Sequence, residues 1–110
     1  MGYTKKILRE GDGACPQRGQ TVTVHCTGYL AQGEKKFWST KDPGGEPFSF
    51  QVGIGQVIRG WDDGLLSMQK NESARLHLTS DVAYGAKGFP AWGIPPNAEL
   101  IFDIDLLNVR

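Results

Sequence analysis

Strict alternation of apolar and polar residues in three segments constrains the fold of this 110-residue chain most. The segments are TVTVHCTGYL (21–30), SARLHLT (73–79) and ELIFDIDLL (99–107). A period of two residues is typical of a β-strand with one buried face. The residues predicted to face inward are Val22, Val24, Cys26, Ala74, Leu76, Leu78, Leu100, Phe102, Ile104 and Leu106.

Two shorter segments, TKKILRE (4–10) and PFSFQV (47–52), are further strand candidates. Gly/Pro-rich turns separate the five segments, which favours an antiparallel sheet with one buried face. A chain of this length forms one domain around one hydrophobic core, so residues 1–110 are expected to be a single domain.

A helix is predicted in QVIRGWDDGLLSMQ (56–69), where the period changes from two residues to three or four. Asp62 and Asp63 fall in its early turns and complement the helix dipole. Gly60 and Gly64 lower its helix propensity, so it depends on packing across the sheet. The fold class is therefore α+β. The apolar stripe of this helix comprises Val57, Trp61, Leu65 and Met68.

Charge and cysteine content exclude several classes of protein. Twelve basic and twelve acidic residues give no net charge, and no Lys/Arg run marks a nucleic-acid or anionic-lipid surface. No apolar run has the length of a membrane span. Cys15 and Cys26 form no CxxC pair, which favours a cytoplasmic protein without a disulfide framework, although the two could pair under oxidation.

Several weaker motifs are better explained without catalysis. GIGQVI (53–58) lacks the third glycine of a dinucleotide fingerprint, and a turn explains its two glycines. His25 and His77 occupy polar strand positions with no metal-ligand spacing, so we interpret them as surface or hydrogen-bonded histidines. No metal or other cofactor is therefore expected.

The acidic pairs also favour a structural role. Asp62/Asp63 fits a charge bias at the start of a helix, and Asp103/Asp105 fits a solvated strand face, in preference to a glycosidase pair. The sequence contains neither a GxSxG nor an HExxH motif. Any catalysis is thus expected to need no nucleophile and no metal.

The segment YGAKGFPAWGIPP (84–96) predicts a stiff loop, because glycine and proline impose turns. Aromatic and apolar residues in this loop, the helix start and the sheet form either the core or the wall of an apolar ligand pocket. They are Phe37, Trp38, Phe48, Phe50, Val57, Ile58, Trp61, Tyr84, Phe89, Trp92, Ile94 and Phe102.

Four stretches, VTVHCTGYL, PFSFQVGIGQVIRGWDDGL, DVAYGAKGFP and GIPPNAELIFDIDLL, closely resemble the FKBP-type peptidyl-prolyl cis-trans isomerases, the immunophilins that bind tacrolimus and rapamycin. FWSTKD and GFPAWGIPP are more similar to plant-type members. The resemblance implies a five- to six-stranded antiparallel half-barrel sheet wrapped around one short helix, in a cytoplasmic monomer. It also implies proline-containing peptides, macrolides and client proteins docked at the pocket rim as partners.

The resemblance also assigns residues to a prolyl pocket. Trp61 would form its floor, and the backbone N–H of Ile58 and the hydroxyl of Tyr84 would donate hydrogen bonds to ligand carbonyls. The loop over residues 85–95 would overhang the opening. The walls and rim would comprise Phe37, Trp38, Phe48, Val57, Phe89, Trp92, Ile94 and Phe102.

This chain departs from the animal members at the pocket edge. Cys26 replaces a usual Tyr, Trp38 a usual Asp and Phe89 a common His, and Pro43 lies near a usual Arg. The loop around residues 92–93 is about one residue longer. Because the Asp, Arg and Tyr positions form a polar cluster beside the drug in the family, we expect altered macrolide affinity. Trp38 is expected to enlarge the apolar rim.

Three functions stay open at this stage. The chain could catalyse X–Pro isomerisation, use the same pocket as a binding module, or serve as a structural domain without a ligand. Turnover that is lost when Trp61 or Tyr84 is changed favours the first, and partner capture without turnover favours the second.

Overall fold

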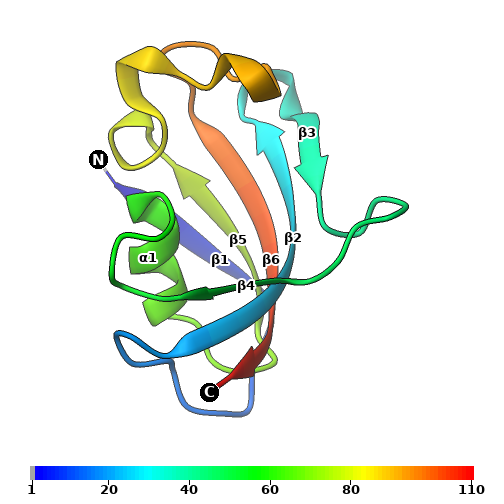
Figure 1. The fold of residues 1–110 in the computed structure, drawn as a ribbon, viewed down its shortest axis with the longest axis vertical. Helices are drawn as coiled ribbons and strands as arrows, with labels where there is room; N and C mark the ends of the chain where they lie inside the picture. Colours follow the sequence, from blue (N-terminus) through cyan, green and yellow to red (C-terminus); the bar gives the residue numbers. More distant parts are fainter. Residues whose placement is uncertain (1) are drawn as a thin grey trace.

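A computed structural model describes residues 2–110, which form six strands and one α-helix (Figure 1). The helix lies against one face of a curved sheet, which confirms the predicted α+β class and a sheet wrapped around one short helix. The elements are β1 (Tyr3–Arg9), β2 (Thr21–Leu30), β3 (Lys35–Ser39), β4 (Phe48–Gln51), α1 (Arg59–Leu66), β5 (Ser73–Leu78) and β6 (Leu100–Val109).

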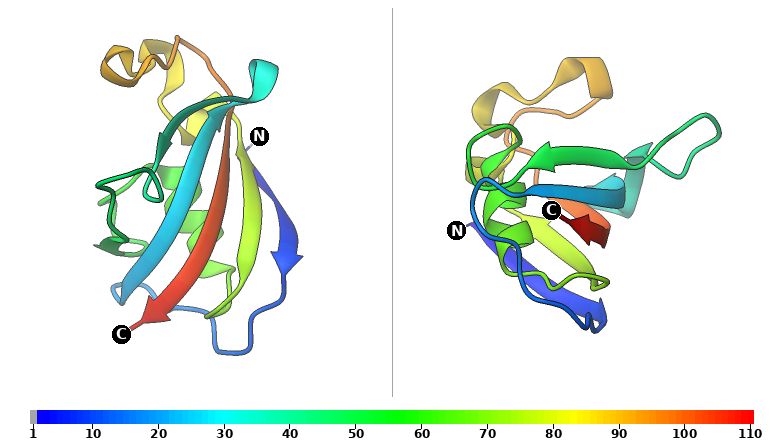
Figure 2. Two further views of the ribbon diagram at one scale, coloured as in Figure 1. Left: turned by 90° about the vertical axis from the view of Figure 1, so that its right-hand side faces the viewer. Right: turned by 60° about the horizontal axis from the view of Figure 1, so that its bottom comes forward.

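All paired strands are antiparallel, in the order β1-β5-β6-β2-β3, with β4 also pairing β2. Strand β3 pairs the second half of β2 and β4 pairs its first half, so both lie along one edge of β2. Residues 40–47 leave this edge and extend from the body of the molecule (Figure 2). Strand β3 was not predicted from the sequence, because its adjacent Phe37 and Trp38 break the alternation.

The core forms where the inward faces of β2, β5 and β6 meet α1, as the alternation predicts. Every second residue of these strands is buried, and helix α1 covers this concave face (Figure 2). The predicted inward residues all have relative exposures of 2% or less: Val22, Val24, Cys26, Ala74, Leu76, Leu78, Leu100, Phe102, Ile104 and Leu106.

Helix α1 is shorter than the predicted segment 56–69. Ile58 has an extended backbone (φ −59°, ψ 149°), and the first helical residue is Arg59. At the other end, the hydroxyl of Ser67 donates to the carbonyl of Gly64 at 2.6 Å. Val57 and Met68, predicted within the helix, therefore flank it, although both still contribute to the apolar interior.

Gly60 and Gly64 bring the helix close to the sheet. A Cβ on Gly60 would lie 2.6–3.0 Å from three side-chain atoms of Leu78 on β5, and one on Gly64 would lie 2.6 Å from Cδ1 of Leu76. Both distances are shorter than van der Waals contact. The two glycines that weaken the isolated helix are therefore required for its packing.

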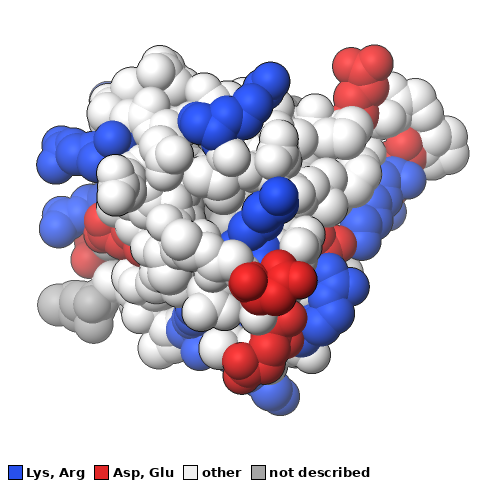
Figure 3. All heavy atoms as spheres, turned by 90° about the horizontal axis from the view of Figure 1, so that it is seen from below, with Lys and Arg blue, Asp and Glu red and all other residues white. Residues whose placement is uncertain are grey.

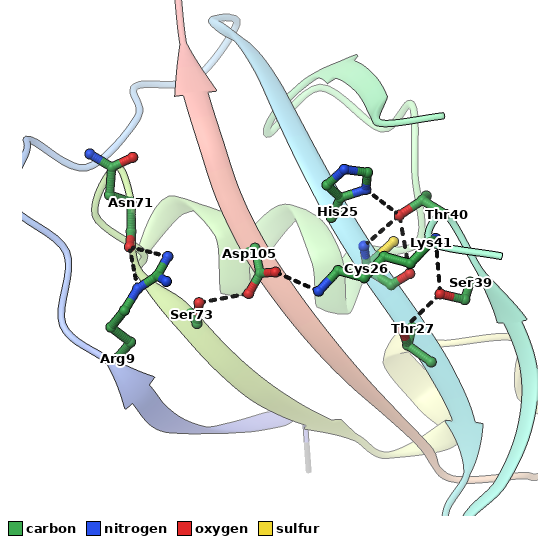
Figure 4. Close-up of polar contacts among 10 residues, drawn as sticks. All are labelled: Arg9, His25, Cys26, Thr27, Ser39, Thr40, Lys41, Asn71, Ser73 and Asp105. Carbon is green, nitrogen blue, oxygen red and sulfur yellow. Dashed lines mark hydrogen bonds and ion pairs between the residues drawn. The ribbon is translucent and has the colours of Figure 1, made fainter. Parts of the chain in front are cut away.

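The convex face of the sheet carries a polar network (Figure 4). The carboxylate of Asp105 accepts hydrogen bonds from Ser73 Oγ at 2.6 Å and Lys41 Nζ at 2.9 Å. Partial burial alone would raise the pKa of Asp105, but these donors outweigh it and lower the pKa. Asp103 likewise binds Arg75 through both oxygens, at 2.7 and 3.0 Å. The two aspartates are therefore ion-paired and not merely solvated.

Both histidines lie in hydrogen bonds on this side of the sheet. His25 Nδ1 is 2.9 Å from Thr40 Oγ1 (Figure 4), and His77 Nε2 is 2.7 Å from a carboxylate oxygen of Glu99. The buried Thr40 hydroxyl also accepts the backbone N–H of Cys26 at 2.9 Å. The hydroxyl of Thr40 thereby ties the end of β3 to β2.

A largely buried ion pair connects β1 to the segment after the helix. Lys5 Nζ lies 2.9 Å from Glu72 Oε2, and the side chains are 17% and 3% exposed. Lys5 also donates to the carbonyl of Ser67 at 2.8 Å, and Glu72 Oε1 accepts the backbone N–H of Gln69 at 3.1 Å. Both ions therefore have additional hydrogen bonds, which a buried charge requires.

Charges of both signs lie side by side on the face shown in Figure 3, between broad uncharged areas. In residues 2–110, no helix has the length and apolar character needed to cross a membrane. Both cysteines are unpaired, with Cys15 exposed and Cys26 buried. Burial raises the pKa of the Cys26 thiol to about 12, so this thiol stays protonated at neutral pH.

Candidate functional site

A cavity of about 530 Å³ lies between the start of α1, the sheet and the segment that follows β5. Of the described residues that line it, none is charged, and six of the nine are aromatic. An apolar concavity with few polar groups is the usual form of a small-ligand site. Its lining comprises Trp38, Phe48, Gln56, Val57, Ile58, Trp61, Tyr84, Trp92 and Phe102.

Trp61 is almost fully enclosed in this cavity, with 4% of its surface exposed. Its ring meets Phe102 edge-on at 5.2 Å between centroids, and it lies 5.7 Å from Phe50 and 6.1 Å from Phe48. These contacts hold the indole in a fixed position. Trp61 Nε1 is buried and has no hydrogen-bond partner in the part of the chain that the structure describes.

The segment between β4 and the helix forms a turn that Asp62 holds in place. The buried carboxylate of Asp62 accepts the backbone N–H groups of Gly53 at 2.9 Å and Gly55 at 3.0 Å. Both glycines have positive φ, which only glycine adopts readily. We expected Asp62 to complement the helix dipole, but its direct partners are these turn amides.

The turn ends at Ile58, whose extended backbone precedes the helix. Its carbonyl accepts the N–H groups of Trp61 and Asp62, at 3.0 and 3.2 Å. Among residues 2–110, its own N–H has no hydrogen-bond acceptor. An open backbone donor therefore lies at the edge of the cavity, beside the lining side chain of Ile58.

The predicted stiff loop consists of short 3₁₀ turns, at Gly85–Lys87 and Pro90–Trp92. Two backbone hydrogen bonds between Phe89 and Ile94, at 2.9 and 3.1 Å, close its outer part. Ile94 is 2% exposed and anchors the loop in the core. The loop is thus held in one conformation by its own backbone.

Tyr84 lies at the entrance of this loop and is half-buried. Its ring stacks on Phe89 at 5.2 Å between centroids. Burial raises the pKa of the Tyr84 hydroxyl above its ordinary value. Within the described chain this hydroxyl has no hydrogen-bond partner, so it is a second open donor at the cavity.

Gly28 on β2 makes room for two aromatic rings. A Cβ at this position would lie 2.7 Å from Phe37 and 2.8 Å from Phe102. The two rings meet edge-on at 5.9 Å, and Phe37 also lies 6.2 Å from Trp92. Phe37 therefore supports Phe102 and Trp92 from behind.

The family model for FKBP-type peptidyl-prolyl cis-trans isomerase matches residues 13–107, which is most of the chain and includes the whole cavity. The chain belongs to this family of isomerases. Proteins named peptidyl-prolyl cis-trans isomerase FKBP12, from Vicia faba and Arabidopsis thaliana, are each 58% identical over the full length of both chains. FK506-binding protein 1 from Yarrowia lipolytica is 46% identical over the same share.

The cavity of this FKBP-type chain brings together eight of the eleven side chains that sequence analysis proposed for the pocket. Phe37, Phe89 and Ile94 lie outside the lining and instead contact or position residues that form it. The lining residue that sequence analysis missed is Gln56. The Gln56 side-chain oxygen accepts the backbone N–H of Gln51 at 2.8 Å, and its amide nitrogen donates to the Gln51 side chain at 3.1 Å. In the sequence, only its position next to Val57 indicated that it could line the pocket.

Removing the Asp62 carboxylate is expected to destabilise the FKBP-type fold. Asp62→Ala leaves the N–H groups of Gly53 and Gly55 without their partner, and hydrogen bonds to a charged group contribute about 1.5–3 kcal/mol each. The neighbouring Asp63→Ala is the matched control, because Asp63 is exposed and forms a 3.5 Å pair with Arg59, which is worth about 0.5 kcal/mol or less. Urea denaturation measures both; equal losses would contradict the role of Asp62.

Proposed function

We propose that this chain accelerates cis-trans isomerisation of X–Pro bonds in peptides and proteins by enclosing the prolyl group in the cavity above Trp61. The observation that carries this proposal is an uncharged aromatic cavity with two unpartnered donors at its edge, the Ile58 N–H and the Tyr84 hydroxyl. The relatives named peptidyl-prolyl cis-trans isomerase support it.

The physical basis of catalysis lies in the amide bond. Rotation about it costs about 18–20 kcal/mol, because the C–N bond has partial double-bond character. Resonance makes the planar amide more dipolar than the twisted one, so an aromatic cavity without charges solvates the planar form less well than water does. Moving the bond from water into the cavity therefore narrows the energy gap between the planar and twisted forms.

The two donors add stabilisation that favours the rotated state. In our proposal Ile58 N–H and the Tyr84 hydroxyl donate to ligand carbonyls, and interactions that strengthen on rotation lower the barrier. The stacked and hydrogen-bonded loop supplies them without much reorganisation. Phe48, Val57 and Phe102 are proposed to contact the prolyl group directly. Trp38, Phe89 and Trp92 would form the rim of the cavity. Phe37 and Ile94 would support these residues from outside the lining.

We expect Tyr84→Phe to lower kcat/KM by about tenfold, the effect of losing one hydrogen bond of about 1.4 kcal/mol in the transition state. Trp61→Leu, which removes the floor, is expected to lower it further. The measurement is exchange NMR on a Leu-Pro-Phe peptide. Because burial raises the pKa of Tyr84, its hydroxyl stays protonated below the ordinary tyrosine value of about 10, and kcat/KM should be flat from about pH 6 to 9.

Tyr3→Phe is the matched control, because Tyr3 lies on β1, away from the cavity lining. It should leave kcat/KM unchanged. Equal turnover in the wild type, Tyr84→Phe and Trp61→Leu would refute the proposed site. A chain without turnover that still captures a proline-containing partner would instead be a binding module.

The same cavity is proposed to take tacrolimus- and rapamycin-type macrolides. The name of the Yarrowia lipolytica relative, FK506-binding protein 1, supports this ligand class. Trp38 lines the cavity here, so Trp38→Asp is expected to change drug affinity measurably by calorimetry. Unchanged affinity would count against a contact between Trp38 and the drug, and catalysis untouched by rapamycin would separate turnover from macrolide binding.

We also infer a monomer that works in the cytoplasm. Unpaired Cys15 and Cys26 are typical of a reducing compartment. On the open edge of the sheet, β1 has an irregularity between Ile7 and Arg9, which disfavours edge-to-edge pairing of two chains.

A further inference from the structure

The aromatic surface of the cavity continues outward beyond its floor. Trp38 lies 6.1 Å from Trp61 between ring centroids and stacks on Trp92 at 5.5 Å with 19° between the planes. Trp92 is 40% exposed. A row of three indoles therefore leads from the most enclosed part of the cavity to solvent.

The outer two rings, the Trp38/Trp92 pair, are fixed before any ligand arrives. Trp38 lies on β3, where its backbone is in register with Gly28 of β2. Trp92 ends a 3₁₀ turn and donates its N–H to the carbonyl of Phe89 at 3.0 Å. The Phe89 ring meets Trp92 edge-on at 5.2 Å, so side-chain packing also restrains the indole.

The chemistry of the pair selects its ligand. No charged side chain contributes to the described lining of the cavity, so an ionised ligand group would lose hydration without gaining a partner. An aromatic side chain gains more binding free energy from this pair than an aliphatic one of similar size, because offset and edge-on ring contacts add to the effect of burial. Part of the Trp92 indole is exposed, so the pair is accessible from solvent at that ring.

The Trp38/Trp92 pair lies within reach of the side chain of a residue next to the substrate proline. Adjacent Cα atoms are about 3.8 Å apart across a trans peptide and about 2.9 Å across a cis one. With a prolyl ring over Trp61, the side chain of a neighbouring residue reaches the next ring of the row. For a residue after the proline this contact is kept while the X–Pro bond rotates, whereas a residue before the proline changes its direction from the prolyl ring.

We propose that the Trp38/Trp92 pair is a specificity subsite that takes an aromatic side chain directly flanking the substrate proline. This rests on the proposed function, because it assumes that the proline occupies the cavity above Trp61. Since contact with the flanking side chain stabilises the bound peptide, the preference is expected in kcat/KM.

The test compares X-Pro and Pro-X peptides with X as Phe, Leu, Lys or Ala, by exchange NMR, which needs no coupled protease. We expect kcat/KM for the Phe peptide to exceed that for Leu by about threefold to tenfold, the worth of one aromatic contact. Trp92→Leu should abolish this ratio, so that the Phe and Leu peptides have equal kcat/KM. Trp38→Leu should reduce it as a second, independent variant.

Tyr29→Leu is the matched control, since Tyr29 lies outside the cavity lining, with Arg75 6.0 Å from its ring centroid. The subsite would be overturned if the wild type gave equal rates for Phe and Leu, or if both tryptophan variants kept the Phe preference. Turnover of the Ala peptide would in either case uphold the proposed function. A Lys peptide favoured over Phe would also overturn it, in favour of a cation site. No turnover of any peptide would refute the proposed function itself.

Discussion

Replacing Lys5 by methionine is expected to lower the free energy of unfolding by about 3–5 kcal/mol, the usual cost of leaving one buried charge without its partner. The Glu72 carboxylate is 3% exposed and would keep only the N–H of Gln69 as a donor. Since small domains are stable by about 5–15 kcal/mol, this is a large share of the total. Urea denaturation monitored by tryptophan fluorescence measures the loss.

Lys6→Met is the matched control, because Lys6 is the next residue of β1 and is exposed. Its effect should stay within about 0.5 kcal/mol. The double variant Lys5→Met/Glu72→Leu should recover most of the stability, because a buried ion pair can often be replaced by apolar groups at little cost. Similar losses in Lys5→Met and Lys6→Met would show that the pair contributes little.

Changing Gly60 to valine is expected to destabilise the fold by about 3 kcal/mol, the upper end of the usual cost of overpacking a core. Three atoms of the Leu78 side chain lie within 3.0 Å of where the new Cβ would be. Leu78 is fully buried, so its side chain can move only by displacing its neighbours in the core. The helix would have to shift away from β5, and Trp61 would shift with it.

Arg59→Val measures the separate effect of valine on helix propensity, because Arg59 is exposed and adjacent. It should cost less than about 1 kcal/mol. In the double variant Gly60→Val/Leu78→Ala the two losses should be less than additive, because the smaller side chain makes room for the larger. Strict additivity would mean that the two residues do not compete for the same space.

The strands with one buried face could be predicted from the sequence because their alternation records that burial directly. The inward residues of β2 and β6, such as Val24 and Ile104, were all assigned correctly. Strand β3 escaped detection because Phe37 and Trp38 are consecutive residues. This strand is determined by its hydrogen bonds to β2 and its contacts with the loop around Trp92, which no local sequence pattern indicates.

The site could be predicted in composition but not in arrangement. The aromatic residues stood out in the sequence, whereas the division between lining and supporting residues depends on packing, as Phe37 shows. The partners of Asp62 were not predicted, because Gly53 and Gly55 lie nine and seven residues before it in irregular chain. The Lys5–Glu72 pair joins residues 67 positions apart, and no local pattern signals such a pair.

The excursion of residues 40–47 between β3 and β4 has a consequence for engineering. Ser39 and Phe48 are both held by pairing with β2, so the length of chain between them does not affect the register of the sheet. Doubling a flexible loop adds only about 0.6 kcal/mol of closure entropy. Phe48 of the cavity directly follows this excursion, and Trp38 lies two residues before it. The exposed part of this excursion, residues 41–47, is therefore a natural insertion point, where a grafted recognition segment would be presented beside the cavity.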